Sequence, residues 1–282
     1  MTNTAIATET QYANIDSKRI AYRIIGKGAP IILSNRFRGT LDTWDPLFLD
    51  LLAETNTVIT FDYSGIGYSE GELPLGIKEV AAQAVKLADH LSIDKFHVGG
   101  WSYGGVVAQY TTFLYPTRIL STVVIGSNPM GKRDIPTSPL FLERALKPIQ
   151  DFDDMFVLFF EPKSEKSRTA AQTSWGRIAQ GIDRSKLPSA PEVLQRYFAV
   201  FPEVAEDNDN FRELYQTLEI PVLVISGDHD ISFAVENWLP LLQKAPSVQH
   251  IILPSTGHAP HFQYPEISTG YIKNFLNNGK TK

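Results

Sequence analysis

The sequence contains no cysteine, which excludes a thiol nucleophile, disulfide bonds and a cysteine-ligated zinc site. It also lacks a block of lysine and arginine, and its formal net charge is −5, so charge gives no reason to expect nucleic acid or an anionic membrane as a partner. No hydrophobic run approaches the roughly 18 apolar residues of a membrane span. The N-terminus lacks the basic start and apolar stretch of a secretory signal. We therefore expect a cytoplasmic protein whose partner is a small molecule, and a homodimer is compatible with the sequence.

The chain does have the length and apolar content for a sizeable core. Its 282 residues are 43% hydrophobic, which fits one large domain or two modest ones. Short apolar runs alternate with helical patterns, and strands in such an alternation are buried on both sides. The pattern predicts an α/β fold, a mostly parallel central sheet with helices on both faces. Strands are expected at 18–25, 30–34, 57–63, 95–100, 121–127, 221–227 and 248–254, and helices at 45–54, 80–91, 105–115, 233–243 and 267–276.

One segment, residues 128–215, breaks this alternation. It has no clear buried strand, holds eight of the 18 prolines, and is too long for a loop. We interpret it as a helical cap inserted over the carboxyl edge of the sheet, with residues 1–127 and 216–282 forming the core domain. The first ten residues are small and polar, and we expect them to be loosely ordered.

The stretch "GGWSYGG", residues 99–105, places Ser102 between two aromatic residues and two pairs of glycines. It follows a predicted strand and begins a predicted helix, the context in which G-x-S-x-G holds a serine out on a strained turn. Gly100 and Gly104 allow neighbouring backbone to pass close to this turn. The helix N-terminus offers free N–H groups to a developing negative charge. Ser102 is therefore a candidate nucleophile, and the alternative is a serine that only caps the helix.

A serine hydroxyl needs a base to take its proton, and the base needs an acid to orient it. His258 follows the last predicted strand on a loop, and His261 is its nearest competitor, with packing on the last helix as the alternative role. For the acid, Asp228 and Asp230 both follow the preceding strand, and one of them can simply stabilise the turn. The chain order is then serine, aspartate, histidine, as in nucleophile-elbow enzymes.

Taken together, these motifs resemble the α/β-hydrolase superfamily. The resemblance covers nearly the whole chain, because "GKGAPIIL", "LDTWDPLFLDLLAE", "VITFDYSGIGYSEG", "HVGGWSYGGVVAQYTTFLYP", "PVLVISGDHD" and "STGHAPHFQYPE" occur in the family's order and spacing. It implies the α/β-hydrolase fold, with the inserted segment as the family's helical cap. It also places the nucleophile on Ser102, the base on His258 and the acid on Asp230, and it matches Asp62 to an aspartate of structural role.

The loop after the second predicted strand departs from the family pattern. The family has His-Gly followed by an apolar residue whose main-chain N–H binds the oxyanion; here Asn35 and Arg36 stand in the His-Gly places and Phe37 in the donor place. Tyr103 supplies the second N–H in this scheme. The arginine in place of glycine changes what the loop backbone can do. It also puts Arg36 and Arg38 beside the pocket, where they either bind an acidic group of the substrate, brace the loop or face water.

The resemblance implies a serine hydrolase that acts through an acyl-enzyme on a small, largely apolar carboxylic ester, lactone or thioester, with no metal and no organic cofactor. Trp101, Phe156 and Phe159 are expected to line the substrate pocket with the two arginines, and ordinary packing is the alternative for each aromatic residue. Serine at the elbow argues against dehalogenases and epoxide hydrolases of similar fold, which use aspartate there. The alternatives that keep the triad are C–C bond hydrolysis and cofactor-free perhydrolase or haloperoxidase-like activity. A slow-turnover small-molecule receptor of the same fold is the alternative from another class.

Overall fold

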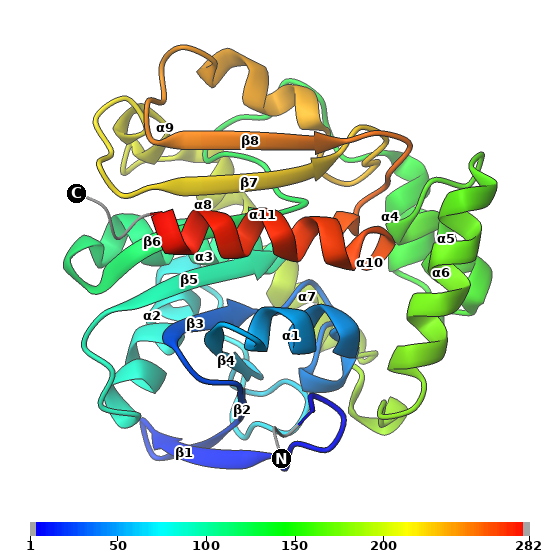
Figure 1. The fold of residues 1–282 in the computed structure, drawn as a ribbon, viewed down its shortest axis with the longest axis horizontal. Coiled ribbons are helices and arrows are strands. Elements are labelled where there is room, and N and C mark those ends of the chain that lie inside the picture. Colours follow the sequence, from blue (N-terminus) through cyan, green and yellow to red (C-terminus); the bar gives the residue numbers. More distant parts are fainter. Residues whose placement is uncertain (1–3, 279–282) are drawn as a thin grey trace.

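Eight strands form one sheet in the computed structural model, which describes residues 4–278 (Figure 1). The strands are β1 Gln11–Ile15, β2 Lys18–Ile25, β3 Ala29–Ser34, β4 Asn56–Phe61, β5 Phe96–Trp101, β6 Ile119–Ile125, β7 Val222–Gly227 and β8 Val248–Leu253. Their order across the sheet is β1-β2-β4-β3-β5-β6-β7-β8. Strand β2 runs antiparallel to both of its neighbours, and the other pairs are parallel, which confirms the predicted mostly parallel sheet.

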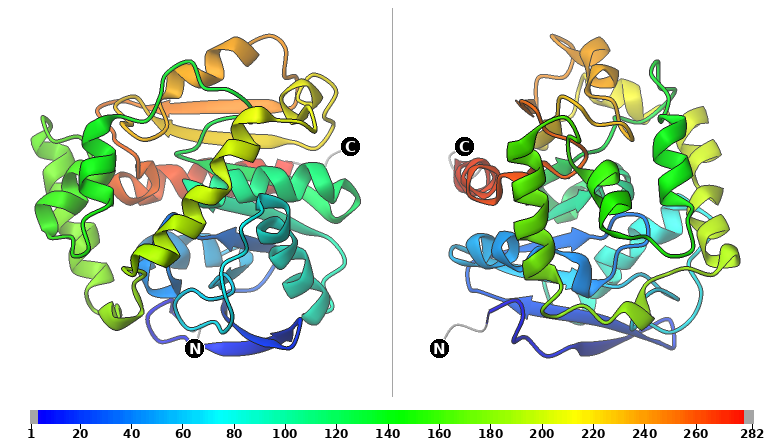
Figure 2. Two further views of the ribbon diagram at one scale, coloured as in Figure 1. Left: turned by 180° about the vertical axis from the view of Figure 1, so that it is seen from behind. Right: turned by 90° about the vertical axis from the view of Figure 1, so that its right-hand side faces the viewer.

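Helices cover both faces of this sheet. One face carries α1 (Pro46–Ala53) and α11 (Pro265–Asn278), and the other carries α2 (Ile77–His90) and α3 (Tyr103–Leu114), as Figure 2 shows from two sides. Strands β5 and β7 are buried along their whole length, which explains why they read as continuous apolar runs rather than as alternating patterns.

The chain between β6 and β7, all of which is described, forms helices and no strand: α4 Pro139–Ala145, α5 Phe152–Phe159, α6 Glu165–Ile178, α7 Pro191–Ala199, α8 Phe201–Glu206 and α9 Phe211–Leu214. The arrows of β7 and β8 point toward the side of the molecule where α4, α5 and α6 stand (Figure 1). In contrast, α7 and α8 pack on the first residue of α3, because the ring of Tyr103 contacts Tyr197 and Phe201. The bounds of a separate cap at residues 128 and 215 stay a prediction.

A buried ion pair ties the inserted helices to the rest of the chain. Asp45 caps α1 by accepting the N–H of Leu47 at 3.0 Å. The same carboxylate accepts two hydrogen bonds from Arg177 on α6, from Nε at 2.7 Å and from Nη2 at 2.5 Å, and a third from the Ser174 hydroxyl at 2.7 Å. The Asp45 side chain is fully buried, so this bidentate pair holds α6 against the start of α1.

Three local predictions differ from the structure. Strand β1 was not expected; only Ala13 and Ile15 of its five residues are buried, because it lies at the edge of the sheet. The helix expected at 233–243 is a short 3-10 stretch, Val235–Leu241, since Pro240 inside it has no N–H to donate. At the N-terminus, residues 1–3 lie outside the described residues. In the described part, Ala5 is buried and its main-chain N–H donates to the Asp50 carboxylate at 2.7 Å, which ties this segment to α1.

Within residues 4–278, no helix combines the length and the apolar character that a membrane crossing requires.

Candidate active site

Ser102 lies on the sharp turn between β5 and α3. Its backbone has φ 60° and ψ −119°, a strained conformation for a residue with a side chain, and its N–H donates to the carbonyl of Ile125 at 2.9 Å. A Cβ atom at Gly100 would lie 2.0 Å from the carbonyl oxygen of Gly104, and one at Gly104 would lie 2.0 Å from that of Ser34. These two positions therefore accept only glycine, and the close backbone approach that they permit is what holds the serine at the turn.

His258 and Asp230 form a buried hydrogen-bonded pair. Nδ1 of His258 lies 2.7 Å from Oδ2 of Asp230, and both side chains are almost fully buried. The other carboxylate oxygen, Oδ1, accepts the main-chain N–H groups of Ser232 at 2.8 Å and Phe233 at 2.9 Å. Because both oxygens are engaged, the carboxylate has one orientation, and through it the imidazole has one orientation as well.

Strand register brings this pair together, because Gly227 at the end of β7 pairs with Leu253 at the end of β8. The two loops that follow these strands are therefore neighbours. Asp228, the other candidate acid, faces the exposed His229 at 2.6 Å and accepts the N–H of Thr256 at 3.1 Å. It stabilises the turn, and it is Asp230 that reaches the histidine.

His261, the competing histidine, is completely buried. Its ring packs against Trp44, Phe48 and Trp101, and neither ring nitrogen has a hydrogen-bond partner among the described residues. Burial, followed by the charges of His258 and Arg36, lowers the pKa of His261 well below its usual range. It stays neutral and has no acid to orient it, so its position matches the packing alternative.

Ser102 and His258 line the same small cavity, which has a volume of about 10 Å³. Nε2 of His258 has no hydrogen-bond partner among the described residues, so no hydrogen bond joins it to the Ser102 hydroxyl in this structure. A larger cavity of about 330 Å³ adjoins this one. Four residues contribute to the lining of both cavities: Arg36, Arg38, Gln150 and Phe159.

The loop after β3 lies beside the serine turn, since Ser34 at the end of β3 pairs with Gly100 of β5. Phe37 on this loop lines the small cavity, and the main-chain N–H groups of Phe37 and Tyr103 donate to no acceptor in the described part of the chain. Two unpaired N–H groups on neighbouring backbone are the arrangement that an oxyanion site requires.

Hydrogen bonds of the Asn35 and Asp62 side chains fix the position of this loop. The Asn35 amide donates to the carbonyl of Phe61 at 2.8 Å and accepts from the indole N–H of Trp44 at 2.5 Å. Asp62 accepts the main-chain N–H of Leu41 at 2.8 Å. Burial raises the pKa of Asp62 to about 7, against the effect of its backbone hydrogen bonds. These contacts fit the structural role that the resemblance implied for Asp62.

Arg38 braces the inserted helices. Its guanidinium donates to four main-chain carbonyls, at distances between 2.6 and 3.1 Å, those of Ala145, Lys147, Pro148 and Pro188. All four belong to the chain between β6 and β7. The bracing alternative thus holds for Arg38, although its side chain also lines both cavities.

Arg38→Met is therefore expected to lower the free energy of unfolding by about 3 kcal/mol, because four carbonyls lose a charged donor together. Urea denaturation monitored by tryptophan fluorescence measures this change. Lys95→Met, which removes an equal charge from an exposed position just before β5, serves as the control and should change stability by about 0.5 kcal/mol or less. Equal losses in the two variants would contradict the bracing role.

The aromatic residues predicted to line the pocket separate into two groups. Phe156 and Phe159 line the large cavity, and Phe159 also lines the small one. Trp101 lines neither cavity, which differs from the prediction. Its indole N–H donates to the main-chain carbonyl of His258 at 2.8 Å, and its ring is 1% exposed, so it supports the histidine loop from within the core.

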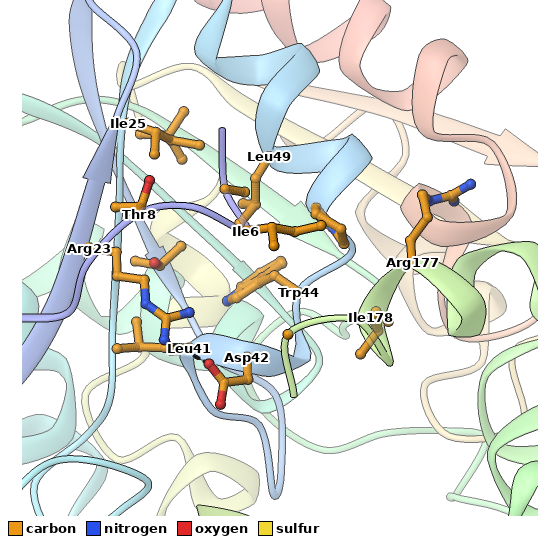
Figure 3. A pocket seen from close by; sticks show the side chains of 15 residues that line it. Ile6, Thr8, Arg23, Ile25, Leu41, Asp42, Trp44, Leu49, Arg177 and Ile178 are labelled. Carbon is orange, nitrogen blue, oxygen red and sulfur yellow. Dashed lines mark hydrogen bonds and ion pairs between the residues drawn. The ribbon is translucent and has the colours of Figure 1, made fainter. Parts of the chain in front are cut away.

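A third hollow, of about 70 Å³, lies away from these residues, between the N-terminal segment, β2, α1 and α6 (Figure 3). Arg23 points toward Asp42 there and forms an ion pair with it at 2.7 Å. None of Ser102, Asp230 and His258 lines it. In the described part of the chain, no three acidic or imidazole side chains gather in a way that could hold a metal ion.

Comparison with known proteins finds a family that matches most of this chain. Residues 30–265 match the family described as alpha/beta hydrolase fold. The solved structure of an alpha/beta hydrolase fold protein from Chitinophaga pinensis is similar with a TM-score of 0.88 and 27% sequence identity, over 98% of this chain and 99% of that chain. The eight-stranded sheet with helices on both faces is accordingly an alpha/beta hydrolase fold, as the resemblance implied.

Two curated relatives differ in how much of them this chain covers. The dihydrolipoyllysine-residue acetyltransferase component of the acetoin cleaving system from Pseudomonas putida is 27% identical over 241 residues, which is 82% of this chain and 59% of that protein. The chain therefore spans less than two thirds of that relative's length. The pimeloyl-acyl-carrier protein methyl ester esterase from Nitrosomonas europaea is 25% identical over 252 residues, 86% of this chain and 93% of that protein.

Proposed function

The chain belongs to the alpha/beta hydrolase fold family, and on this premise we propose that it is a serine hydrolase that acts on a small, largely apolar carboxylic ester, lactone or thioester. The observation that carries the proposal is the hydrogen bond between His258 Nδ1 and Asp230 Oδ2, which leaves Nε2 free in a residue that lines one cavity with Ser102. The esterase name of the Nitrosomonas relative supports the ester class.

In this mechanism Nε2 of His258 accepts the proton of the Ser102 hydroxyl as Oγ forms a bond to the substrate carbonyl carbon. The carbonyl electron pair moves to the oxygen, and the N–H groups of Phe37 and Tyr103 bind the resulting oxyanion. When the oxyanion collapses, the bond to the leaving oxygen or sulfur breaks, and His258 returns the proton to it. Water then attacks the acyl-enzyme by the same proton transfers. Asp230 accepts the hydrogen bond from Nδ1 and so holds the imidazole in the tautomer whose Nε2 can take a proton.

The first step requires a hydrogen bond from the Ser102 hydroxyl to Nε2, which this structure lacks. Such hydrogen bonds commonly tighten only when substrate binds. To form this hydrogen bond, Oγ has to move by rotation about the Cα–Cβ bond of Ser102. The backbone on either side cannot supply the movement, because the close contacts at Gly100 and Gly104 fix it.

The cavities support a small and mainly apolar substrate. The large cavity, about 330 Å³, lies at the lower end of the range of small-molecule sites, roughly 300 to 1,000 Å³. Its lining is mainly aromatic and aliphatic, and it is formed largely by α5 and α6, including Phe156 and Phe159. Helices above the reacting atoms exclude water, which strengthens each electrostatic contact in the site.

Hydrolysis of short-chain nitrophenyl esters tests the proposal. We expect sustained turnover at about 1 per second or faster, because the three residues suit repeated acyl transfer. A receptor of the same fold should release at most one nitrophenol per protein molecule. Release that stops at one equivalent would therefore contradict the proposal.

The alternatives that share these three residues need other substrates. C–C bond hydrolysis is measured with β-diketones, and perhydrolase activity with hydrogen peroxide and a short carboxylic acid. Rates on these compounds that exceed those on esters, lactones and thioesters would replace the proposed substrate class. The cytoplasmic location, the homodimer and the absence of nucleic-acid and membrane partners stay predictions.

A further inference from the structure

Arg36 is a buried cation without a counter-charge. Its side chain is buried, with 7% of the residue exposed, and no carboxylate within the described chain forms an ion pair with it. After burial, the like charge of Arg38 is the largest influence that lowers its pKa. Burial and this repulsion lower the pKa of Arg36 to about 9, so the group is still cationic at neutral pH.

Two of the half-buried arginines elsewhere in the molecule are paired with buried carboxylates. Arg23 contacts the Asp42 carboxylate at 2.7 Å, and Arg177 contacts Asp45 through two parallel hydrogen bonds. An unpaired buried charge is destabilising, and an apolar residue of similar volume in its place is commonly neutral or stabilising. Pairing with a carboxylate of the protein therefore does not explain an arginine at position 36.

The donors that Arg36 leaves free share one edge of its guanidinium. Nη1 donates to the carbonyl of Phe37 at 2.7 Å, whereas Nε and Nη2 donate to no described residue. Nε–H and Nη2–H are parallel and match the two oxygens of a carboxylate. The protein uses this same edge at Arg177, where Nε and Nη2 bind the two oxygens of Asp45.

The guanidinium is held where a substrate would lie. Its central carbon is 4.7 Å from the ring centroid of Phe159 and 5.2 Å from that of Trp101. Arg36 lines the large cavity, and it lines the small cavity together with Ser102 and His258. A group bound to it is therefore close to the proposed nucleophile.

We propose that the Nε–Nη2 edge of Arg36 binds a carboxylate of the substrate. The preferred substrates are then acids, for example the monoester of a short dicarboxylic acid, in which a few bonds separate the carboxylate from the reacting carbonyl and an apolar group fills the large cavity. This inference rests on the proposed function for the identity of the reacting carbonyl, but the binding of the carboxylate does not depend on catalysis.

A merely structural role for Arg36 is the competing explanation, because the bond from Nη1 to the Phe37 carbonyl also supports the loop. The two roles differ in what they predict for charge. Loop support affects acidic and neutral ligands alike, whereas carboxylate binding affects only the acid. The structural role also predicts a large loss of stability in Arg36→Met, and the proposed role predicts an unchanged or raised melting temperature.

Isothermal calorimetry on the Ser102→Ala protein measures binding without turnover. The ligands are monophenyl glutarate and its methyl ester, which differ only in the free carboxylate. We expect the acid to bind roughly 10- to 100-fold more tightly than the methyl ester, as for hydrogen bonds between charged groups. Adding Arg36→Met should remove that preference while the methyl ester binds within about twofold of its former affinity, an estimate that assumes an unchanged apolar cavity.

Two further variants complete the experiment. Arg36→Lys keeps the charge without the fork, so its preference for the acid should be intermediate. Lys95→Met removes one exposed charge just before β5 and controls for the net charge of the protein, so its preference should equal that of the Ser102→Ala protein.

Equal affinities for acid and methyl ester before Arg36 is changed, or equal losses for both ligands after it is changed, would overturn the inference. If the acid preference disappears with Arg36→Met but no ester is ever turned over by the protein with Ser102 intact, the inference stands and the proposed function fails. If esters are turned over and the acid preference is absent, the proposed function stands and the inference fails.

Discussion

Ser102→Ala should lower the turnover number for nitrophenyl esters by about a millionfold, the size of effect seen when a triad serine is removed. The expected loss is this large because no other nucleophile is available at the site: the chain has no cysteine, and His261 is buried away from any acid. The residual rate should come from direct attack of water on the ester, with the oxyanion stabilised by the N–H groups of Phe37 and Tyr103. Steady-state assays at saturating ester, with the variant purified separately from wild-type protein, measure the change.

A matched control for this variant is Ser127→Ala. Ser127 is a buried serine just beyond the end of β6, and its hydroxyl has no hydrogen-bond partner among the described residues, Asp230 and His258 included. Its removal should leave the turnover number within about threefold, as for a substitution away from reacting groups. A comparable loss in both variants would show that the effect arises from packing around β5 and β6 rather than from a missing nucleophile.

Asp230→Asn should lower the turnover number by about ten-thousandfold, as in other triads. The reason lies in the hydrogen bonds of the carboxylate. The N–H groups of Ser232 and Phe233 bind Oδ1, so they will hold the carbonyl oxygen of the asparagine and leave its NH₂ group facing Nδ1 of His258. The imidazole must then accept at Nδ1 and carry its proton on Nε2, where it can no longer take the proton of the serine.

Asp228→Asn is the control for that change. Asp228 contacts His229 and the N–H of Thr256, and it is exposed. Its substitution should change the turnover number by no more than about threefold, since the turn keeps an acceptor for the Thr256 N–H. Steady-state rates of the two variants on one ester measure the difference. If Asp228→Asn proves the damaging change, Asp230 is not the acid of the site.

Much of the architecture could be predicted because its signals are local. Buried parallel strands read as short apolar runs, and the serine turn reads as glycines at the places where backbone approaches backbone, Gly100 and Gly104. The residues alone left Asp228 and Asp230 as equal candidates. Only the match to the family motif favoured Asp230. In the structure, Asp230 is the carboxylate that is hydrogen-bonded to His258.

Other features could not be predicted, because they depend on contacts between residues that lie far apart along the chain. Arg36 and Arg38 are two residues apart and read alike, yet the partners of Arg38 are carbonyls more than 100 positions away, while Arg36 has none of these. Strand β1 has only two buried residues, too few for a clear pattern. Trp101 was expected in the pocket because it adjoins the serine, but the strand turns its ring toward the carbonyl of His258 instead.

Reaction with a fluorophosphonate, followed by peptide mapping in a mass spectrometer, tests most directly whether Ser102 is the nucleophile activated by His258. The expected result is a single phosphonyl adduct on the peptide that contains Ser102, formed far more slowly in His258→Ala. An adduct on any other residue, or unmodified protein that still hydrolyses esters after prolonged reaction, would contradict this account of the site.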